Sequence, residues 1–277
     1  MSGRIADPRR RRRRTAGDIV EGADVEPLTL HAMDGVRIDA GYTAGVGDLC
    51  VVLVHGFTGN WRQPNTRRIA ARLSQVGAVI AIDLRGHGRS GGLSTVGDRE
   101  VLDVDAAVRH ARHLGYERVA LVGFSLGGMI SIRHAALIGG VEAVVSVSAP
   151  SRWYYRDTKP MRQAHWAIER PAGRLAVRLA RHTRVASKRW EEEPEAPYRV
   201  ADRISPVPFL VVHGDADPFL PAEHGRLLYD SAAEPRELWM ESGFGHAEGA
   251  ATPELIGRIS GWVAARTRDR EPGRAPT

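Results

Sequence analysis

The fold prediction begins with residues 119–128, which read V-A-L-V-G-F-S-L-G-G. The short apolar run at 119–122 favours a β-strand, and the run at 126–138 favours an α-helix. Between them, residues 123–127 match the pattern G-x-S-x-G, in which a serine occupies a strained strand-to-helix turn with glycines where side chains would clash. Ser125 is therefore the candidate nucleophile.

A second match to this pattern, at residues 88–92, lacks that context. It reads G-R-S-G-G, no strand directly precedes it, and the following Gly91-Gly92-Leu93 does not favour the start of a helix. With 30 glycines in the chain, a single match to the pattern can arise by accident. Ser90 is therefore rejected as the nucleophile.

On either side of the Ser125 turn, short β-branched and apolar runs alternate with longer amphipathic segments. This alternation is typical of a mostly parallel sheet covered by helices. Eight strands are predicted, at 28–32, 36–42, 49–54, 79–82, 119–122, 141–147, 209–212 and 237–240. The first two flank Asp34-Gly35, a hairpin signal. Five helices are predicted, at 66–75, 98–114, 126–138, 222–231 and 253–266.

The length of 277 residues fits one α/β domain with tails. We predict a disordered Arg-rich tail at 1–24, a single domain at 25–266 and a frayed tail at 267–277. Residues 151–205 are too long for a simple connection between two strands, and they are predicted to form an insertion within the domain, here called the cap.

The net charge of +6 is concentrated at the start of the chain. Residues 1–14 contain seven Arg and one Asp, which leaves 32 basic and 32 acidic residues in the remainder. A neutral body is not typical of a nucleic-acid-binding domain, and we expect no nucleic-acid partner beyond a nonspecific contact of the arginine run. A polyanion-binding arm remains the alternative interpretation of that run.

Cysteine and apolar content limit the class of protein further. Cys50 is the single cysteine, which excludes a disulfide framework and a cysteine-based zinc cluster, and is compatible with a cytoplasmic location. The longest apolar run, 49–54, is far too short for a transmembrane span. His110 and His113 share a predicted helix, but no further ligands complete a metal-binding spacing. We predict no metal and no cofactor.

Four more segments, together with the serine turn, resemble the α/β-hydrolase superfamily. They are His55-Gly56-Phe57, D-L-R-G-H-G-R-S at 83–90, H-G-D-A-D-P-F-L-P at 213–221, and Gly245-His246. The resemblance covers about residues 25–266 apart from the cap. The G-F-S-L-G-G turn and the short cap are most similar to the bacterial esterase and monoglyceride-lipase-like branch. The dehalogenase branch is disfavoured, because it has Asp where Ser125 stands.

The resemblance implies an eight-stranded, mostly parallel sheet flanked by helices, with the cap inserted after strand 6. It also implies a catalytic triad of Ser125, Asp217 and His246, in the chain order of this fold. Nucleophilic catalysis requires the same roles, because a serine hydroxyl needs an adjacent base and that base needs a carboxylate to orient it. Asp215 is the rival carboxylate.

The oxyanion of a tetrahedral intermediate would be held by the backbone N–H groups of Phe57 and Leu126. The other histidines near the motifs, His55, His87 and His213, are interpreted as structural hydrogen-bonding residues. Cys50, inside an apolar strand, is interpreted as an inert core residue.

The cap holds three of six Trp and three of six Tyr, and it carries 13 Lys or Arg against 7 Asp or Glu. Residues 172–181 form an amphipathic helix with a basic stripe of Arg174, Arg178 and Arg181. Three interpretations stay open: a cap with a solvated basic face whose aromatics pack on the body, a pocket roof that selects apolar or anionic acyl groups, and an interfacial lid. The predicted pocket residues are Phe57, Trp153, Tyr154 and Phe219.

The predicted function is hydrolysis of a carboxylic ester of a small molecule through an acyl-enzyme on Ser125. The alternatives are a thioesterase, lactonase, amidase or C–C hydrolase of the same fold, and a non-catalytic member that binds a ligand.

Overall fold

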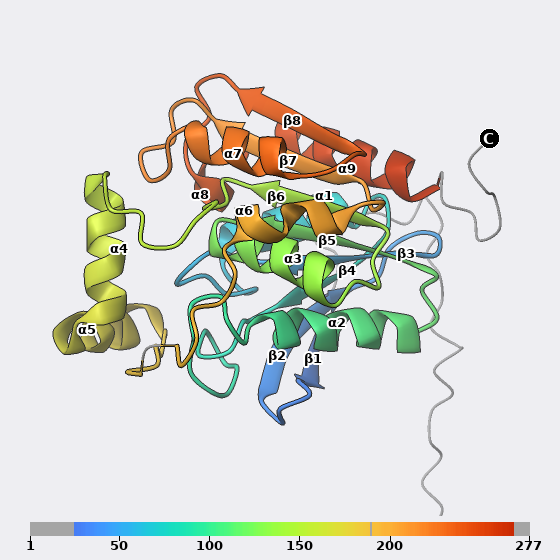
Figure 1. The fold of residues 1–277 in the computed structure, drawn as a ribbon. Helices are drawn as coiled ribbons and strands as arrows, with labels where there is room; N and C mark the ends of the chain where they lie inside the picture. Colours follow the sequence, from blue (N-terminus) through green and yellow to red (C-terminus); the bar gives the residue numbers. More distant parts are fainter. Residues whose placement is uncertain (1–24, 189, 269–277) are drawn as a thin grey trace, which may run out of the picture.

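A computed structural model of the chain describes residues 25–188 and 190–268. Its centre is one eight-stranded sheet with the strand order β1-β2-β4-β3-β5-β6-β7-β8 (Figure 1). Strands β3 to β8 are mutually parallel, and the antiparallel pair β1–β2 joins the sheet through β4. The strands are β1 Val25–His31, β2 Arg37–Thr43, β3 Leu49–Val54, β4 Ala78–Ile82, β5 Arg118–Phe124, β6 Ala143–Val147, β7 Phe209–Gly214 and β8 Arg236–Glu241. The predicted fold class and all eight predicted strands are confirmed.

Helices connect the strands and cover both faces of the sheet. They are α1 Pro64–Leu73, α2 Val101–His113, α3 Leu126–Leu137, α4 Lys159–Glu169, α5 Pro171–Arg181, α6 Pro197–Val200, the 3₁₀ helix η2 Ala201–Ile204, α7 Glu223–Ser231, α8 Ala247–Ala250 and α9 Pro253–Arg268. Helices α2, α3 and α7 pack on one face and α1 and α9 on the other (Figure 1). Each of the five helices predicted between the strands has its counterpart.

The continuous apolar runs form strands because the sheet is buried on both faces. All six residues of β3 are buried, and successive residues alternate between two separate hydrophobic clusters. Cys50 and Val52 belong to the cluster under α2 and α3, whereas Val51 and Leu53 belong to the cluster under α1 and α9. Such strands read as unbroken apolar runs, and this is why the sequence indicates them so clearly.

The two edges of the sheet differ from its centre. The β1–β2 hairpin turns at Gly35, whose φ of +80° suits glycine, as the Asp34-Gly35 signal predicted. At the opposite edge every residue of β8 is only half-buried. The apolar run at 237–240 therefore forms an edge strand rather than a fully covered one.

The C-terminal boundary differs from the prediction. Helix α9 ends at Arg268, so Thr267 is not part of a frayed tail: its side chain is buried and its hydroxyl donates to the Val263 carbonyl at 2.8 Å. This backbone partner lets a polar residue complete the helix. The remainder of the predicted C-terminal tail and the predicted tail at 1–24 lie outside the described residues.

The cap lies between β6 and β7, as predicted, and contributes α4, α5, α6 and η2. Its last two helices pack against α3 of the body, while α4 and α5 pack on each other and project beside the sheet (Figure 1). Within residues 25–268, no helix combines the length and the apolar character needed to cross a membrane.

Candidate active site

Ser125 lies at the turn between β5 and α3, with φ of 48° and ψ of −117°. This backbone conformation is strained for a residue with a side chain, and such strain is typical of functional turns. Glycine on both sides is required by space: a Cβ on Gly123 would lie 2.3 Å from the Gly127 carbonyl oxygen, and one on Gly127 would lie 2.3 Å from the Val54 carbonyl oxygen. The motif therefore lifts Ser125 out of the sheet at the carboxyl ends of its strands.

Ser90, in the second match to the pattern, has a different environment. It is buried, its hydroxyl donates to the Asp83 carbonyl at 2.5 Å, and it accepts the Asp39 N–H at 2.8 Å. The first hydrogen bond closes the loop after β4 on itself, and the second holds that loop against β2. Ser90 thus lies within a structural turn and does not line the cavity next to Ser125.

The structure brings His246 and Asp217 together with Ser125. His246 Nε2 lies 3.0 Å from Ser125 Oγ, and His246 Nδ1 lies 2.7 Å from Asp217 Oδ2. The three side chains follow β5, β7 and β8, so the parallel sheet brings their loops to one edge. The ring of Phe219 stacks on His246 at a centroid distance of 4.4 Å and restricts its orientation.

Asp217 is held as an anion by its surroundings. Burial on its own would raise the pKa of Asp217, but the hydrogen bond with His246, the charge of that ring, and the N–H groups of Leu220 and Phe219 outweigh it and lower the pKa. Asp217 Oδ1 accepts these two N–H groups at 3.0 and 2.8 Å. The carboxylate is thereby fixed with Oδ2 directed at His246.

Asp215, the rival carboxylate, faces away from His246. It is exposed, and its Oδ1 accepts the Gly243 N–H at 2.7 Å. It therefore ties the loop after β7 to the loop after β8.

The loop after β3 lies on the other side of Ser125. The backbone N–H groups of Phe57 and Leu126 have no hydrogen-bond acceptor among the described residues, and both residues line the cavity. Gly56 donates its N–H to Glu248 Oε1 at 2.7 Å. Sequence reasoning missed Glu248, whose only signal was its place two residues after His246. Burial raises the pKa of Glu248.

The histidines interpreted as structural have hydrogen bonds that hold loops. His55 Nδ1 donates to the Gly56 carbonyl at 2.7 Å and its Nε2 accepts the Leu84 N–H at 3.1 Å. Burial lowers the pKa of His55 to about 4 and that of His87 to about 3, so both rings are neutral near pH 7. His213 Nε2 donates to the Leu220 carbonyl at 2.9 Å and lies 3.9 Å from Asp217 Oδ2.

A cavity of about 780 Å³ opens beside Ser125 and His246. All four predicted pocket residues line it: Phe57, Trp153, Tyr154 and Phe219. Trp153 is fixed by a hydrogen bond of 2.6 Å from its Nε1 to the Pro194 carbonyl, and its ring lies 4.8 Å from that of Trp190. The cavity wall next to the serine is therefore aromatic and rigidly held.

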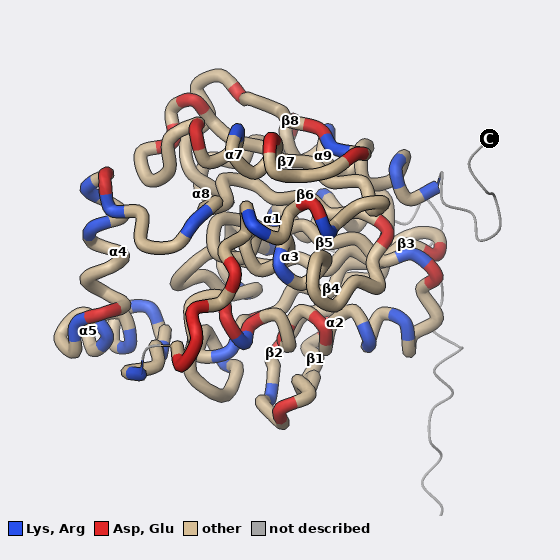
Figure 2. The backbone as a smooth tube through the Cα atoms, viewed as in Figure 1, with Lys and Arg blue, Asp and Glu red and all other residues tan. Residues whose placement is uncertain are grey.

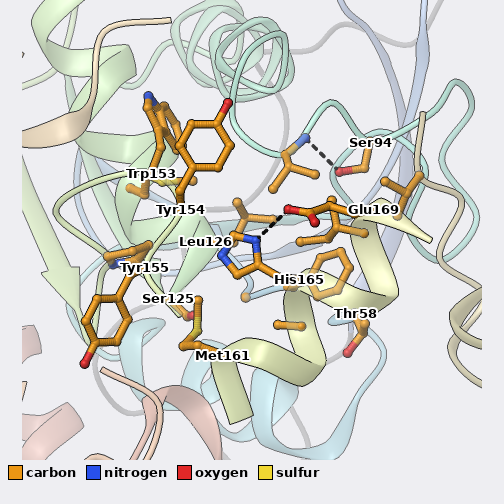
Figure 3. Close-up of a pocket in the computed structure, with 18 of the residues that line it drawn as sticks. Thr58, Ser94, Ser125, Leu126, Trp153, Tyr154, Tyr155, Met161, His165 and Glu169 are labelled. Atoms are coloured by element: carbon orange, nitrogen blue, oxygen red, sulfur yellow. Dashed lines mark hydrogen bonds and ion pairs between the residues drawn. The ribbon is translucent and has the colours of Figure 1, made fainter. Parts of the chain in front are cut away.

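Helix α4, which the sequence did not predict, supplies another part of the cavity wall with Met161, His165 and Ile168. His165 Nδ1 and Glu169 Oε1 are 3.0 Å apart (Figure 3), and Arg156 pairs with the same carboxylate. An i, i+4 pair of His and Glu was the available signal for this helix. This side of the cavity therefore combines apolar side chains with a hydrogen-bonded polar pair.

The basic stripe on α5 is divided by the structure. Arg174 lines the cavity and donates to the Ile168 and Glu169 carbonyls at 3.2 and 2.9 Å, whereas Arg178 and Arg181 are exposed and lie outside the cavity. The stripe as a whole is therefore not a pocket roof. The interpretation that the cap aromatics pack on the body is also wrong for Trp166, which is 49% exposed.

Among residues 25–188 and 190–268, no three His, Cys, Asp or Glu side chains are grouped so that they could hold a metal ion. What the site offers is a hydroxyl, an imidazole and a carboxylate in hydrogen-bonding order, with two N–H groups nearby. This arrangement can transfer a proton from the hydroxyl and receive an anion.

Solved structures share the whole architecture. The esterase Pf2001 of Pyrococcus furiosus superposes with a TM-score of 0.70 at 20% sequence identity, covering 91% of this chain and 93% of that chain. A Xanthomonas campestris protein described as an α/β serine hydrolase without lid superposes with a TM-score of 0.59 at 18% identity, covering 91% and 97%. At these identities the likeness shows the fold.

Curated proteins are similar along most of their length. The uncharacterized protein YfhR of Escherichia coli K12 is 26% identical over 236 residues, which are 80% of this chain and 74% of YfhR. The human serine hydrolase BPHL is 24% identical over 235 residues, which are 76% of this chain and 78% of BPHL.

The sequence profile of the alpha/beta hydrolase family matches residues 51–255, well over half of the chain. This range includes the loop after β3, the serine turn, the cap and the loops that carry Asp217 and His246. The resemblance stated from the motifs is thus confirmed at the level of the superfamily. The chain belongs to the alpha/beta hydrolase family.

Proposed function

We propose that the protein is a serine hydrolase that cleaves carboxylic esters of small molecules. The observation that carries the proposal is the hydrogen-bonded series Ser125–His246–Asp217, with distances of 3.0 and 2.7 Å, at the wall of a cavity of about 780 Å³. A cavity of this size accommodates a small organic substrate.

In the first half of the reaction, His246 Nε2 takes the proton of Ser125 as Oγ attacks the ester carbonyl. Asp217 accepts the Nδ1–H of the imidazole and stabilises its positive charge. The N–H groups of Phe57 and Leu126 hold the oxyanion, and the second lies at the N-terminus of α3, where the helix dipole favours negative charge. His246 then gives its proton to the departing alkoxide, which leaves as the alcohol.

In the second half, water replaces the alcohol. His246 removes one proton from the water, the resulting hydroxide attacks the acyl carbonyl, and the same proton returns to Ser125 Oγ as the acid leaves. No cofactor is needed for this balance. Thioesters, lactones and amides would react through the same acyl-enzyme, so the leaving group is a separate question from the nucleophile.

The walls of the cavity support an apolar acyl group as the substrate portion. Leu126, Met129 and Trp153 line the cavity with apolar side chains, and α4 adds the hydrogen-bonded pair of His165 and Glu169. Burial of methylene groups against such a wall is favourable by about 0.8 kcal/mol per group. The esterase and monoglyceride-lipase-like branch, implied by the serine turn, agrees with this chemistry.

The first test is covalent labelling. A fluorophosphonate probe should label Ser125, and Ser125→Ala should abolish labelling and lower ester turnover on the order of 10⁴-fold or more. Labelling is measured by mass spectrometry of the modified peptide, and turnover with chromogenic esters of increasing chain length, run beside thioesters and aminoacyl amides. The matched control is Ser90→Ala, which should keep the labelling. No labelling, or labelling of Ser90, would refute the proposal, and intact labelling without turnover on any ester would identify a different acyl substrate.

A further inference from the structure

Helix α5 directs its largest apolar side chains away from the protein. Leu175 and Leu179 are 55% and 71% exposed, although they lie at i and i+4 on one face of the helix. The buried position of α5 is Gly173, which packs so closely on α4 that a Cβ there would lie 2.2 Å from the Trp166 carbonyl oxygen. The helix therefore contacts the protein through glycine and leaves its leucines in solvent.

This orientation is the reverse of the usual one. An amphipathic surface helix normally buries its apolar stripe in the domain. Ala172, Ala176 and Ala180 of the same helix are exposed too, and Trp166 of α4 is half exposed. The structure leaves an apolar face on the helical pair α4–α5, and this pair projects beside the sheet (Figure 1).

Basic side chains surround this apolar face. Residues 159–181 contain six Lys or Arg and one acidic residue, Glu169, which is already paired with Arg156. Arg178 and Arg181 are exposed on α5 itself. Figure 2 shows several blue segments along α4 and α5. A partner must therefore accept apolar groups and positive charges together.

We propose that the exposed face of the α4–α5 pair docks on an anionic lipid surface. Lipid tails accept Leu175 and Leu179, while anionic headgroups attract the exposed Arg178 and Arg181 of the same helix. A second copy of this chain fits less well, because it would place two strongly basic faces against each other. An anionic lipid surface satisfies both features of the face.

Docking would place the catalytic cavity beside the lipid. The same helical pair lines the cavity with Met161, His165 and Arg174, on the side of the pair away from the exposed leucines. This docking does not depend on the proposed esterase activity, and its test uses no enzymatic readout.

The test locates the contact with a fluorescent label. Cys50 is completely buried, so a cysteine introduced by Ala176→Cys becomes the accessible thiol for an environment-sensitive fluorophore. With vesicles of phosphatidylcholine mixed with phosphatidylserine, the emission of this label should shift to the blue. The control label is Leu137→Cys, at another exposed apolar position at the end of α3, which should show no shift.

Vesicle sedimentation of the full chain then separates the two contributions. Leu175→Ala with Leu179→Ala should weaken binding to both neutral and anionic vesicles, on the order of 10-fold per leucine. Arg178→Gln with Arg181→Gln should weaken binding to anionic vesicles alone, on the order of 30-fold at low salt. The matched controls are Leu137→Ala with Ile138→Ala and Arg67→Gln with Arg72→Gln, which change exposed residues elsewhere and should bind like the parent.

Three outcomes would overturn the inference. Equal shifts at positions 176 and 137 would indicate binding without orientation, for example through the arginine run at 1–14, which every variant shares. A shift at position 176 that appears on raising the protein concentration without vesicles would identify a second copy as the occupant. No shift at position 176 would show that the face does not enter lipid.

Discussion

Asp217 and Asp215 lie two positions apart in one loop, yet they face different partners. Asp217 accepts hydrogen bonds from His246 and from two loop N–H groups, whereas Asp215 accepts one from the N–H of Gly243. We expect Asp217→Asn to lower kcat on the order of 10⁴-fold, because the amide would stabilise the wrong tautomer of His246. Asp215→Asn should cost less than about tenfold, because the asparagine oxygen can still accept the Gly243 N–H.

The comparison is made by steady-state kinetics on one short ester, with the melting temperature as a check on folding. A severe loss of activity in Asp215→Asn together with a mild loss in Asp217→Asn would show that Asp215, and not Asp217, is the orienting carboxylate.

For single residues, motif and chemistry together predicted Ser125, Asp217 and His246, and the structure brings these side chains into one hydrogen-bonded series. They could not identify Glu248, although it holds the Gly56 N–H beside the serine. The two residues are 192 positions apart, and their contact depends on how α8 and the loop after β3 are packed. No local pattern records such a contact.

Among the elements, the α4–α5 pair depends on one close approach. A Cβ on Gly173 would lie 2.2 Å from the Trp166 carbonyl oxygen and 2.7 Å from the Ala167 Cα, and both atoms belong to backbone. We expect Gly173→Ala to separate the two helices, to lower the melting temperature and to reduce turnover of long-chain esters more than that of short ones. The reason is that α4 lines the cavity, and a long acyl chain contacts more of the cavity wall than a short one.

The matched control is Gly261→Ala in α9, where nothing lies within 4 Å of the added Cβ. In a helix interior this change should stabilise the protein by about 0.5–1 kcal/mol. Thermal unfolding and kinetics with two ester lengths check both variants. Unchanged selectivity in Gly173→Ala would show that the helices need not touch to form the cavity.

The elements were predictable to different degrees. The strands of the parallel sheet are buried on both faces, so their composition alone indicated them, and α5 was indicated by its periodicity. The direction in which Leu175 and Leu179 point was not predictable, because periodicity defines an apolar face without saying what lies opposite it. Helix α4 was missed because its cavity-facing residues Met161, His165 and Ile168 are chemically mixed.

For the molecule as a whole, buried neutral imidazoles connect stability to pH. Burial, with the nearby charge of His213, lowers the pKa of His224 to about 4, whereas an unfolded histidine has a pKa of about 6.5. Between these values the unfolded chain takes up a proton that the folded chain does not, so the free energy of unfolding decreases as the pH falls. Asp83 acts in the opposite sense, because burial raises its pKa to about 6.

A single substitution isolates the contribution of one ring. His224→Gln should reduce the slope of unfolding free energy against pH by about 1.4 kcal/mol per pH unit between pH 6.5 and 4. The difference in unfolding free energy between the parent and the less stable variant should therefore shrink as the pH falls. Urea unfolding at several pH values measures the slope. His31→Gln, at an exposed position, is the control and should leave the slope as it is. Parallel curves for His224→Gln and the parent would mean that this ring takes up its proton equally in both states.

The spread of the site along the chain has a consequence for how the molecule acquires activity. Ser125 and His246 are 121 positions apart, and they meet only when β5, β7 and β8 are in register. Pairings between distant segments form late, because closing long loops costs entropy before the contacts are gained. During synthesis, the histidine emerges after every strand of the sheet has been made. Covalent reactivity at Ser125 would thus be silent in nascent or partly folded chains, and its onset would mark the completion of folding.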